Sequence, residues 1–157
     1  MRRRQLLALV AAIALVGAGA GVSWWQHRAA EQRDAAVRQS TVAANAAAQA
    51  IFSYDYRSFD TSVANAKAFV TGDFAKEYAE TTAALKPSAV SEQAIVRTTV
   101  SSTGVVTARA DRVELLLFVN QYRRNANITG EKVDQNRVVL TLVPVDGEWK
   151  VTRAIAI

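Results

Sequence analysis

The chain has 157 residues, of which 21% are charged and 50% are hydrophobic, and its formal net charge is +5. This composition is ordinary for a folded protein of one domain. No cysteine is present, which excludes a disulfide scaffold, a thiolate metal site and a cysteine nucleophile. Three of the positive charges precede the first apolar segment. The rest of the chain is nearly neutral and has no basic stripe, so we expect no nucleic-acid partner.

Residues 5–26 form a run without a charged side chain. As a helix this run would be roughly 33 Å long, which matches a hydrocarbon core of about 30 Å. The arginines before it predict a cytoplasmic N-terminus, and the tryptophans at its far end are typical of a membrane interface. The residues predicted to anchor and orient the chain are Arg2, Arg3, Arg4, Leu6, Leu7, Leu9, Val10, Ile13, Leu15, Val16, Trp24 and Trp25.

A cleaved signal peptide is the competing interpretation, because Ala18-Gly19-Ala20 resembles a small-residue cleavage site. The tryptophan pair and the unbroken continuation into a second helical stretch favour an anchor. We therefore predict a single-pass protein of the plasma membrane whose C-terminal domain is extracytoplasmic. The predicted divisions are a tail (1–4), a transmembrane helix (5–26), a helical stalk (27–41) and an α+β domain (42–157).

Three helices are expected before any strand. Residues 27–59 are rich in alanine, the strongest helix former, and contain neither glycine nor proline. Asp60 or Thr61 is a suitable N-cap for a second helix over 63–70. A third helix is predicted over 74–85, and Lys86-Pro87-Ser88 should end it.

From residue 95 the apolar spacing changes to that of strands. Gly104 predicts a bend or bulge between the first two, and Asp146-Gly147 predicts a tight hairpin before the last. Helices followed by an antiparallel meander give an α+β domain, and a curved sheet around helices would form a cone with an apolar interior. The predicted strands are 95–102, 105–109, 113–123, 137–143 and 148–157.

Several segments, in chain order, resemble the actinobacterial Mce-associated membrane proteins (Mce stands for mammalian cell entry). The resemblance covers most of the chain, including the N-terminal segment. Its motifs are the alanine-rich helix ending in Ser53-Tyr54-Asp55-Tyr56, then Val70-Thr71-Gly72-Asp73-Phe74 with Tyr78, Phe118-Val119-Asn120-Gln121, Arg137-Val138-Val139-Leu140-Thr141-Leu142, and Asp146-Gly147-Glu148-Trp149-Lys150-Val151.

This resemblance implies a cone-shaped domain like that of nuclear transport factor 2, and an accessory role beside the Mce lipid-import systems of the cell envelope. It brings no catalytic residues with it. We therefore expect a non-enzymatic, membrane-anchored accessory protein without cofactor or metal, whose partners are the bilayer, proteins of an Mce-type import complex and, in one alternative, a lipid ligand. The alternatives are a lipid carrier using the cone interior, a scaffold subunit of another envelope complex, and a cone-fold isomerase.

An isomerase would need an acid or base inside the cone, and Asp55, between Tyr54 and Tyr56, is the best candidate. In the alternative interpretation, which we favour, the tyrosines cover the core edge and Asp55 faces solvent or caps a turn. A zinc site is not expected, because His27 is the single histidine.

Arg153 falls on the face of the last strand that alternation assigns to Trp149, Val151 and Ile155. A charge there is costly unless it is paired or reaches water. Arg153 could meet an anionic lipid head at the mouth of a pocket, or it could pair with Asp111 or Glu114, or lie exposed at a strand end. The candidate pocket or partner residues are Tyr54, Asp55, Tyr56, Phe118, Asn120, Gln121, Trp149 and Arg153.

Overall fold

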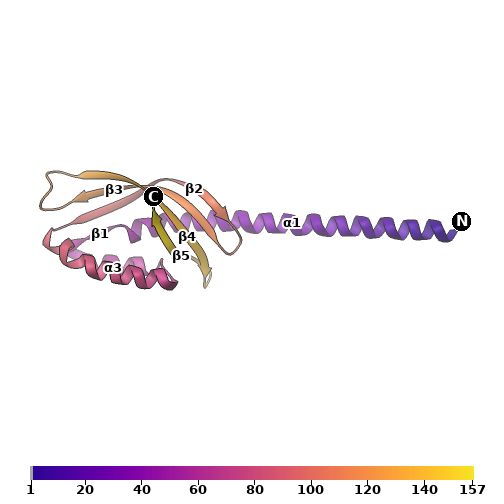
Figure 1. Cartoon of the computed structure of the whole chain (residues 1–157), viewed down its shortest axis with the longest axis horizontal. Helices are drawn as coiled ribbons and strands as arrows, with labels where there is room; N and C mark the ends of the chain where they lie inside the picture. Colours follow the sequence, from indigo (N-terminus) through magenta and orange to yellow (C-terminus); the bar gives the residue numbers. More distant parts are fainter. Residues whose placement is uncertain (1) are drawn as a thin grey trace.

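The computed structural model describes the backbone of residues 2–157 and the side chains from Trp24 onward. A long N-terminal helix leads into a domain of two shorter helices and a five-stranded antiparallel sheet (Figure 1). The elements in chain order are α1 (Arg2–Ile51), β1 (Tyr54–Asp55), the 3-10 helix η1 (Tyr56–Ser58), α2 (Phe59–Lys67), α3 (Gly72–Ser91), β2 (Ile95–Ala108), β3 (Val113–Arg124), β4 (Lys132–Val145) and β5 (Glu148–Ala156). The α+β class is confirmed.

The predicted membrane segment, residues 5–26, falls mostly on residues 1–23, which lie outside those whose side chains the structure describes. Among the described residues, no helix has a stretch long and apolar enough to span a bilayer. The division of the chain into tail, membrane segment, stalk and domain remains a prediction.

Helix α1 ends at Ile51, so the prediction of a helix reaching Phe59 was wrong. The backbone after Ile51 bonds to the start of the sheet instead of continuing the helix. Thr98 donates its hydroxyl to the Phe52 carbonyl (2.8 Å) and its N–H to the Ser53 hydroxyl (2.9 Å). The first bond satisfies the Phe52 carbonyl, which a longer helix would have satisfied internally, and the residues after Ser53 pair with β2 as the short strand β1.

The strands follow one another in the sheet in chain order, β1-β2-β3-β4-β5. The sheet bends over the C-terminal part of α1, with α3 beside it (Figure 1). Alternate residues of the central strands point toward the helices and have almost no exposed surface. These inward-facing residues are Val113, Leu115, Leu117, Val119, Val138, Leu140 and Leu142.

Strand β2 runs without a break through Gly104, so the prediction of two separate strands, 95–102 and 105–109, was wrong. Its pairing with β3 instead slips at two places on either side of the glycine, between Val100 and Ser102 and between Val105 and Thr107. Each slip inserts one unpaired residue, which bends the strand. Two bulges therefore provide the curvature that was assigned to one glycine.

Helix α2 ends at Lys67, before the predicted limit of Val70. The next residues form hydrogen bonds with the edge of β5. The Val151 N–H donates to the Phe69 carbonyl (2.8 Å), and the Thr71 N–H donates to the Val151 carbonyl (2.9 Å). The segment thus covers part of an otherwise open sheet edge, a role that a helix could not fill.

Helix α3 continues through Pro87 to Ser91, so the predicted break at the proline was wrong. Proline removes the N–H that would bond to the carbonyl four residues earlier, at Ala83. Both Pro87 and Ala83 are exposed, so water can satisfy that carbonyl. The Asp146-Gly147 hairpin is confirmed, because both residues have the positive φ angles (52° and 83°) that the predicted turn requires.

Truncation of two adjacent leucines tests the register of β3. Leu117 is fully buried, whereas Leu116 points to the outer face. We expect Leu117→Ala to lower the free energy of unfolding by about 3 kcal/mol, since it leaves a cavity in the core, and Leu116→Ala by about 1 kcal/mol or less. Urea unfolding of the full chain in detergent micelles, followed by circular dichroism, would measure both. Equal losses would contradict the register.

Candidate functional site

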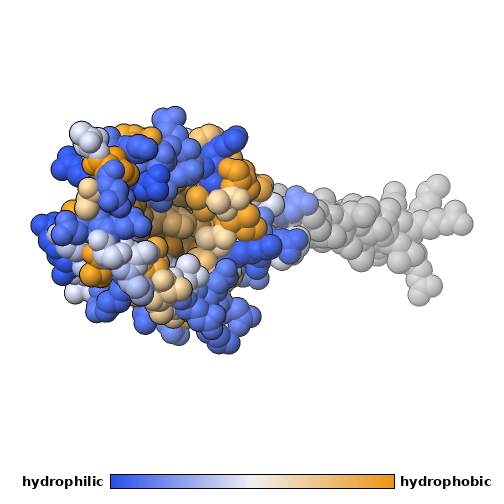
Figure 2. Space-filling model, turned by 60° about the vertical axis from the view of Figure 1, so that its left-hand side comes forward, coloured by the Kyte–Doolittle hydropathy of each residue, from blue (hydrophilic) through white to orange (hydrophobic). Residues whose placement is uncertain are grey.

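A cavity of about 480 Å³ opens between the helices and the inner face of the sheet. Figure 2 shows a hollow with apolar residues inside, surrounded by hydrophilic residues. Its floor is the end of α1, where Ile51 and Phe52 lie. The apolar walls come from α2, α3 and the sheet, and comprise Phe59, Val63, Phe74, Leu85, Val96, Val138, Ala154 and Ala156.

Two tyrosines line the cavity. Burial raises the pKa of the Tyr78 hydroxyl above its ordinary value. Burial also raises the pKa of Tyr54, an effect that the nearby Arg123 opposes and Glu92 reinforces. The Tyr54 ring packs edge-on against Phe59, with ring centroids 5.4 Å apart. Both hydroxyls are therefore neutral near pH 7 and can donate as well as accept a hydrogen bond.

The polar lining residues of the sheet come from the end of β3. Arg123 forms an ion pair with Asp134 of β4, with nitrogen and oxygen 2.7 Å apart. The side-chain carbonyl of Gln121 accepts a hydrogen bond from the side-chain amide of Asn136 (2.9 Å). Gln121 and Arg123 alternate along the strand with outward-facing residues, so the same pairing that buries the leucines brings these two side chains to the cavity.

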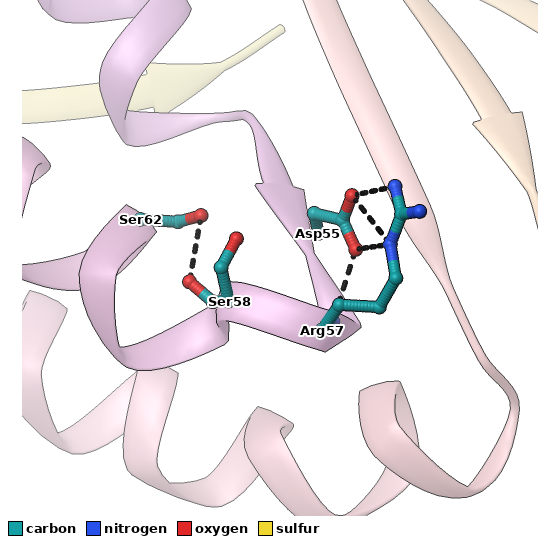
Figure 3. Close-up of polar contacts among 4 residues, drawn as sticks. All are labelled: Asp55, Arg57, Ser58 and Ser62. Atoms are coloured by element: carbon teal, nitrogen blue, oxygen red, sulfur yellow. Dashed lines mark hydrogen bonds and ion pairs between the residues drawn. The ribbon is translucent and has the colours of Figure 1, made fainter.

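Asp55 does not line the cavity. Figure 3 shows its carboxylate turned toward Arg57, which donates its backbone N–H (2.9 Å) and its Nε–H (2.9 Å) to the same oxygen. The hydrogen bonds from the Arg57 side chain, followed by the one from its backbone, lower the pKa of Asp55. A carboxylate held in this ionised form caps η1. The structure thus shows the turn-capping arrangement, and Asp55 is not a buried acid.

The other candidate residues do not gather around the cavity. Trp149 donates its indole N–H to Gln39 of α1 (3.2 Å) on another side of the domain. Phe118, with 41% of its surface exposed, and Asn120 lie on the outer face of the sheet. Tyr56 belongs to η1. Only Tyr54 and Gln121 of the predicted set line the cavity.

Arg153 is on the opposite face from the one predicted. The pairing of β4 with β5 slips between Thr141 and Leu142, which leaves Thr152 as an extra residue on β5. A bulge reverses the alternation that follows it. Val151 is fully buried, whereas Arg153 and Ile155 are exposed and Ala154 lines the cavity. Exposure at a strand end, one of the alternatives, is what the structure shows.

The cavity contains no buried carboxylate among the described residues that line it. Its acidic lining residue, Glu77 of α3, is exposed. In the part of the chain that the structure describes, no group of three or more His, Asp or Glu side chains could hold a metal ion. What the arrangement offers is an apolar space with neutral hydroxyls, suited to holding a molecule.

Sequence reasoning missed Tyr78, Glu77 and Arg123 as lining residues. Glu77 and Tyr78 belong to the helix predicted over 74–85, and that prediction assigned neither of them to a cavity. The sequence did contain a signal for Arg123. Val119, Gln121 and Arg123 are two residues apart, so strand alternation places all three on the same face of the sheet.

Comparison with known proteins gives distant relatives. No protein-family model matches the chain. Uncharacterized protein Rv1362c of Mycobacterium tuberculosis is 27% identical over 139 residues, which is 85% of this chain, and the chain spans 63% of the length of that relative. Outer membrane protein Rv1973 of the same species is 30% identical over 139 residues, covering 86% of this chain and 84% of the relative. The chain belongs to the Rv1973 family.

Solved structures similar to this member of the Rv1973 family share its fold. An IcmL-like type IV secretion system protein from Legionella pneumophila has a TM-score of 0.62 and 18% identity, covering 76% of this chain and 92% of that one. CagV, a VirB8 homolog from Helicobacter pylori, has a TM-score of 0.60 and 12% identity, covering 77% of this chain and 96% of CagV. A putative scytalone dehydratase from Novosphingobium aromaticivorans has a TM-score of 0.59 and 12% identity, covering 81% of this chain and 86% of the dehydratase.

These identities are low enough that the likeness shows the fold alone. The neighbours have the nuclear transport factor 2-like fold, in agreement with the expected cone. Their names include secretion-system proteins and an enzyme, so the fold by itself does not choose between binding and catalysis.

Replacement of Asp55 tests its structural role. We expect Asp55→Ala to lower the free energy of unfolding near pH 7 by about 1 kcal/mol, because a cap is lost. The lowered pKa of Asp55 means that this stabilisation is complete above the unfolded pKa, near 4, and is lost as the pH falls through the folded value. Urea unfolding at a series of pH values would measure it. A difference between the two proteins that grows in acid would contradict this role.

Proposed function

We propose that this chain is a membrane-anchored, non-enzymatic accessory protein that supports an Mce-type lipid-import complex in the cell envelope. The ordered resemblance to the Mce-associated proteins supports the importer, and the name of Rv1973 as an outer membrane protein supports an envelope location. We place the chain at the plasma membrane, because an apolar helical segment preceded by arginines is typical of a single-pass anchor there.

The observation that carries the proposal is the continuity of α1. The same 50-residue helix that begins before the predicted membrane segment ends inside the domain, where Ala44, Ala47 and Ala48 are fully buried. Between Trp25 and the first buried residue, Ala36, lie ten residues, which span roughly 15 Å as a helix. A domain on such a rigid support is held at a set distance from the membrane, as suits a subunit that braces its neighbours.

The non-enzymatic part of the proposal rests on the chemistry of the cone. Asp55, the best candidate for an acid or base, is ion-paired with Arg57 outside the cavity, and the carboxylate that lines the cavity, Glu77, is exposed to solvent. General acid–base catalysis relies on a group whose pKa burial or neighbours have brought toward the working pH.

The outer face of the sheet is the partner surface that we propose. The pairings Leu116–Val139 and Val139–Ile155 place an apolar row across three strands, and Phe118 lies beside it opposite Arg137. Phe118 and Ile155 are 41% and 38% exposed. Exposed aromatic and aliphatic side chains next to arginines are typical of protein interfaces.

Co-purification from native membranes tests this proposal. The tagged full chain, extracted in mild detergent, should bring an Mce component with it. Phe118→Ser should reduce the recovered component several-fold, because it removes an apolar contact, whereas Val105→Ser, at a residue 48% exposed on another strand, should leave recovery unchanged. Quantitative mass spectrometry of the eluates would give both values.

Consistent absence of every Mce component would contradict the importer assignment. Recovery of a different envelope complex instead would support the scaffold alternative. Equal loss of the partner in both serine variants would contradict the outer face as the surface of contact.

A further inference from the structure

We propose that the cone cavity is a binding site for an uncharged, largely apolar molecule with a single hydrogen-bonding head, such as a long-chain alcohol or its ester. This inference does not depend on the importer, because it concerns a ligand of the isolated chain. It rests on three features of the cavity: the apolar walls, the two tyrosine hydroxyls, and the balance of charge at the mouth.

The walls determine the body of the ligand. The volume of about 480 Å³ is within the range of ligand pockets, roughly 300–1,000 Å³. Phe59 and Phe74 of the helices line this space together with the sheet residues Val138 and Ala154. An apolar body placed there removes its own surface and that of the walls from water, which is the main favourable contribution to binding.

The tyrosines determine the head. Tyr78 has 8% of its surface exposed, and no hydrogen bond joins its hydroxyl, or that of Tyr54, to another of the described residues. Neither hydroxyl is a fully buried atom without a partner, so each has accessible surface, and both residues line the cavity. Neutral hydroxyls can donate to a carbonyl or exchange hydrogen bonds with an alcohol.

The charges of the cavity lining favour a neutral head over an anionic one. Arg123 is the basic lining residue, and its ion pair with Asp134 cancels its charge. Glu77 also lines the cavity, and no salt bridge joins it to another described residue. Glu92 lies near enough to Tyr54 to raise that group's pKa. Among these lining residues no cation is left unpaired for a carboxylate or phosphate head, whereas a neutral head needs none.

The absence of cysteine allows a direct test in the full chain. Thr81 lines the cavity and is exposed, and Thr107 is exposed on β2 away from it. Each would be replaced in turn by cysteine, and the variants placed in phosphatidylcholine nanodiscs. The rate of alkylation by N-ethylmaleimide would then be measured with and without 1-dodecanol or dodecanoate at pH 8. The two probes have the same chain length and differ in the charge of the head.

We expect dodecanol to slow the alkylation of Thr81→Cys several-fold and to leave Thr107→Cys unchanged. Dodecanoate should protect much less. Adding Glu77→Gln should increase protection by dodecanoate, whereas Glu80→Gln, a change of the same chemistry on the same helix outside the cavity lining, should not. Tyr78→Phe should weaken protection by dodecanol.

A filled cavity provides the control for occupancy. Ala154→Phe should abolish protection by dodecanol. If that variant does not fold, Ala156→Phe should have the same effect, because Ala156 also lines the cavity but is exposed, so that a larger side chain there disturbs the fold less. The proposal is overturned if dodecanol gives no protection of Thr81→Cys, if it protects Thr107→Cys equally, or if dodecanoate protects as well as dodecanol.

Discussion

The sheet can bend closely over α1 because that helix presents alanine and serine where most core helices present larger side chains. Ala36, Ser40, Ala44 and Ala47 are all buried and follow one another at spacings of three or four residues, Ala48 is buried beside Ala47, and Ile51 lies on the next turn. Such spacings place side chains on one face of a helix. Small side chains there allow the helix backbone to approach the leucines and valines of the sheet, and those larger side chains then fill the interface at the density of a protein interior.

The cavity follows from where this helix stops. Up to Ile51, α1 occupies the space beneath the sheet, and beyond Phe52 the chain leaves that space to form β1 at the sheet edge. The remaining space is lined by α2, α3 and the inner face of the sheet, with the end of α1 as its floor. The hydrogen bonds of Thr98 hold residues 52 and 53, which line the cavity, at the point where the helix ends.

The sequence predicts the parts of this fold that local chemistry controls. Alanine content predicts the long helix, period-two spacing predicts the inner face of β3, and the Asp146-Gly147 turn predicts the last hairpin. It does not predict features in which another segment supplies the hydrogen bonds. The end of α1 depends on Thr98, and the early end of α2 depends on Val151.

The candidate site shows the same limit. Alternation along the last strand placed Arg153 on the inner face, but the bulge at Thr152, which depends on pairing with β4, reverses the faces. Asp55 was identified as a possible acid from its tyrosine neighbours, and its partner Arg57, two residues away, decided its role as a cap. The cavity-lining tyrosine and arginine belong to α3 and β3, and only the tertiary fold brings them together.

Stability of two neighbouring leucine variants tests the seating of the sheet on α1 most directly. Ala47 is fully buried beneath the sheet, and Ala46, the preceding residue, is exposed. Leucine is an equally good helix former at either position, so a difference between the variants reports packing. Ala47→Leu should lower the free energy of unfolding of the full chain by about 1–3 kcal/mol through overpacking, and Ala46→Leu by less than about 0.5 kcal/mol. Equal stability of the two variants would contradict the close approach of helix and sheet on which this account depends.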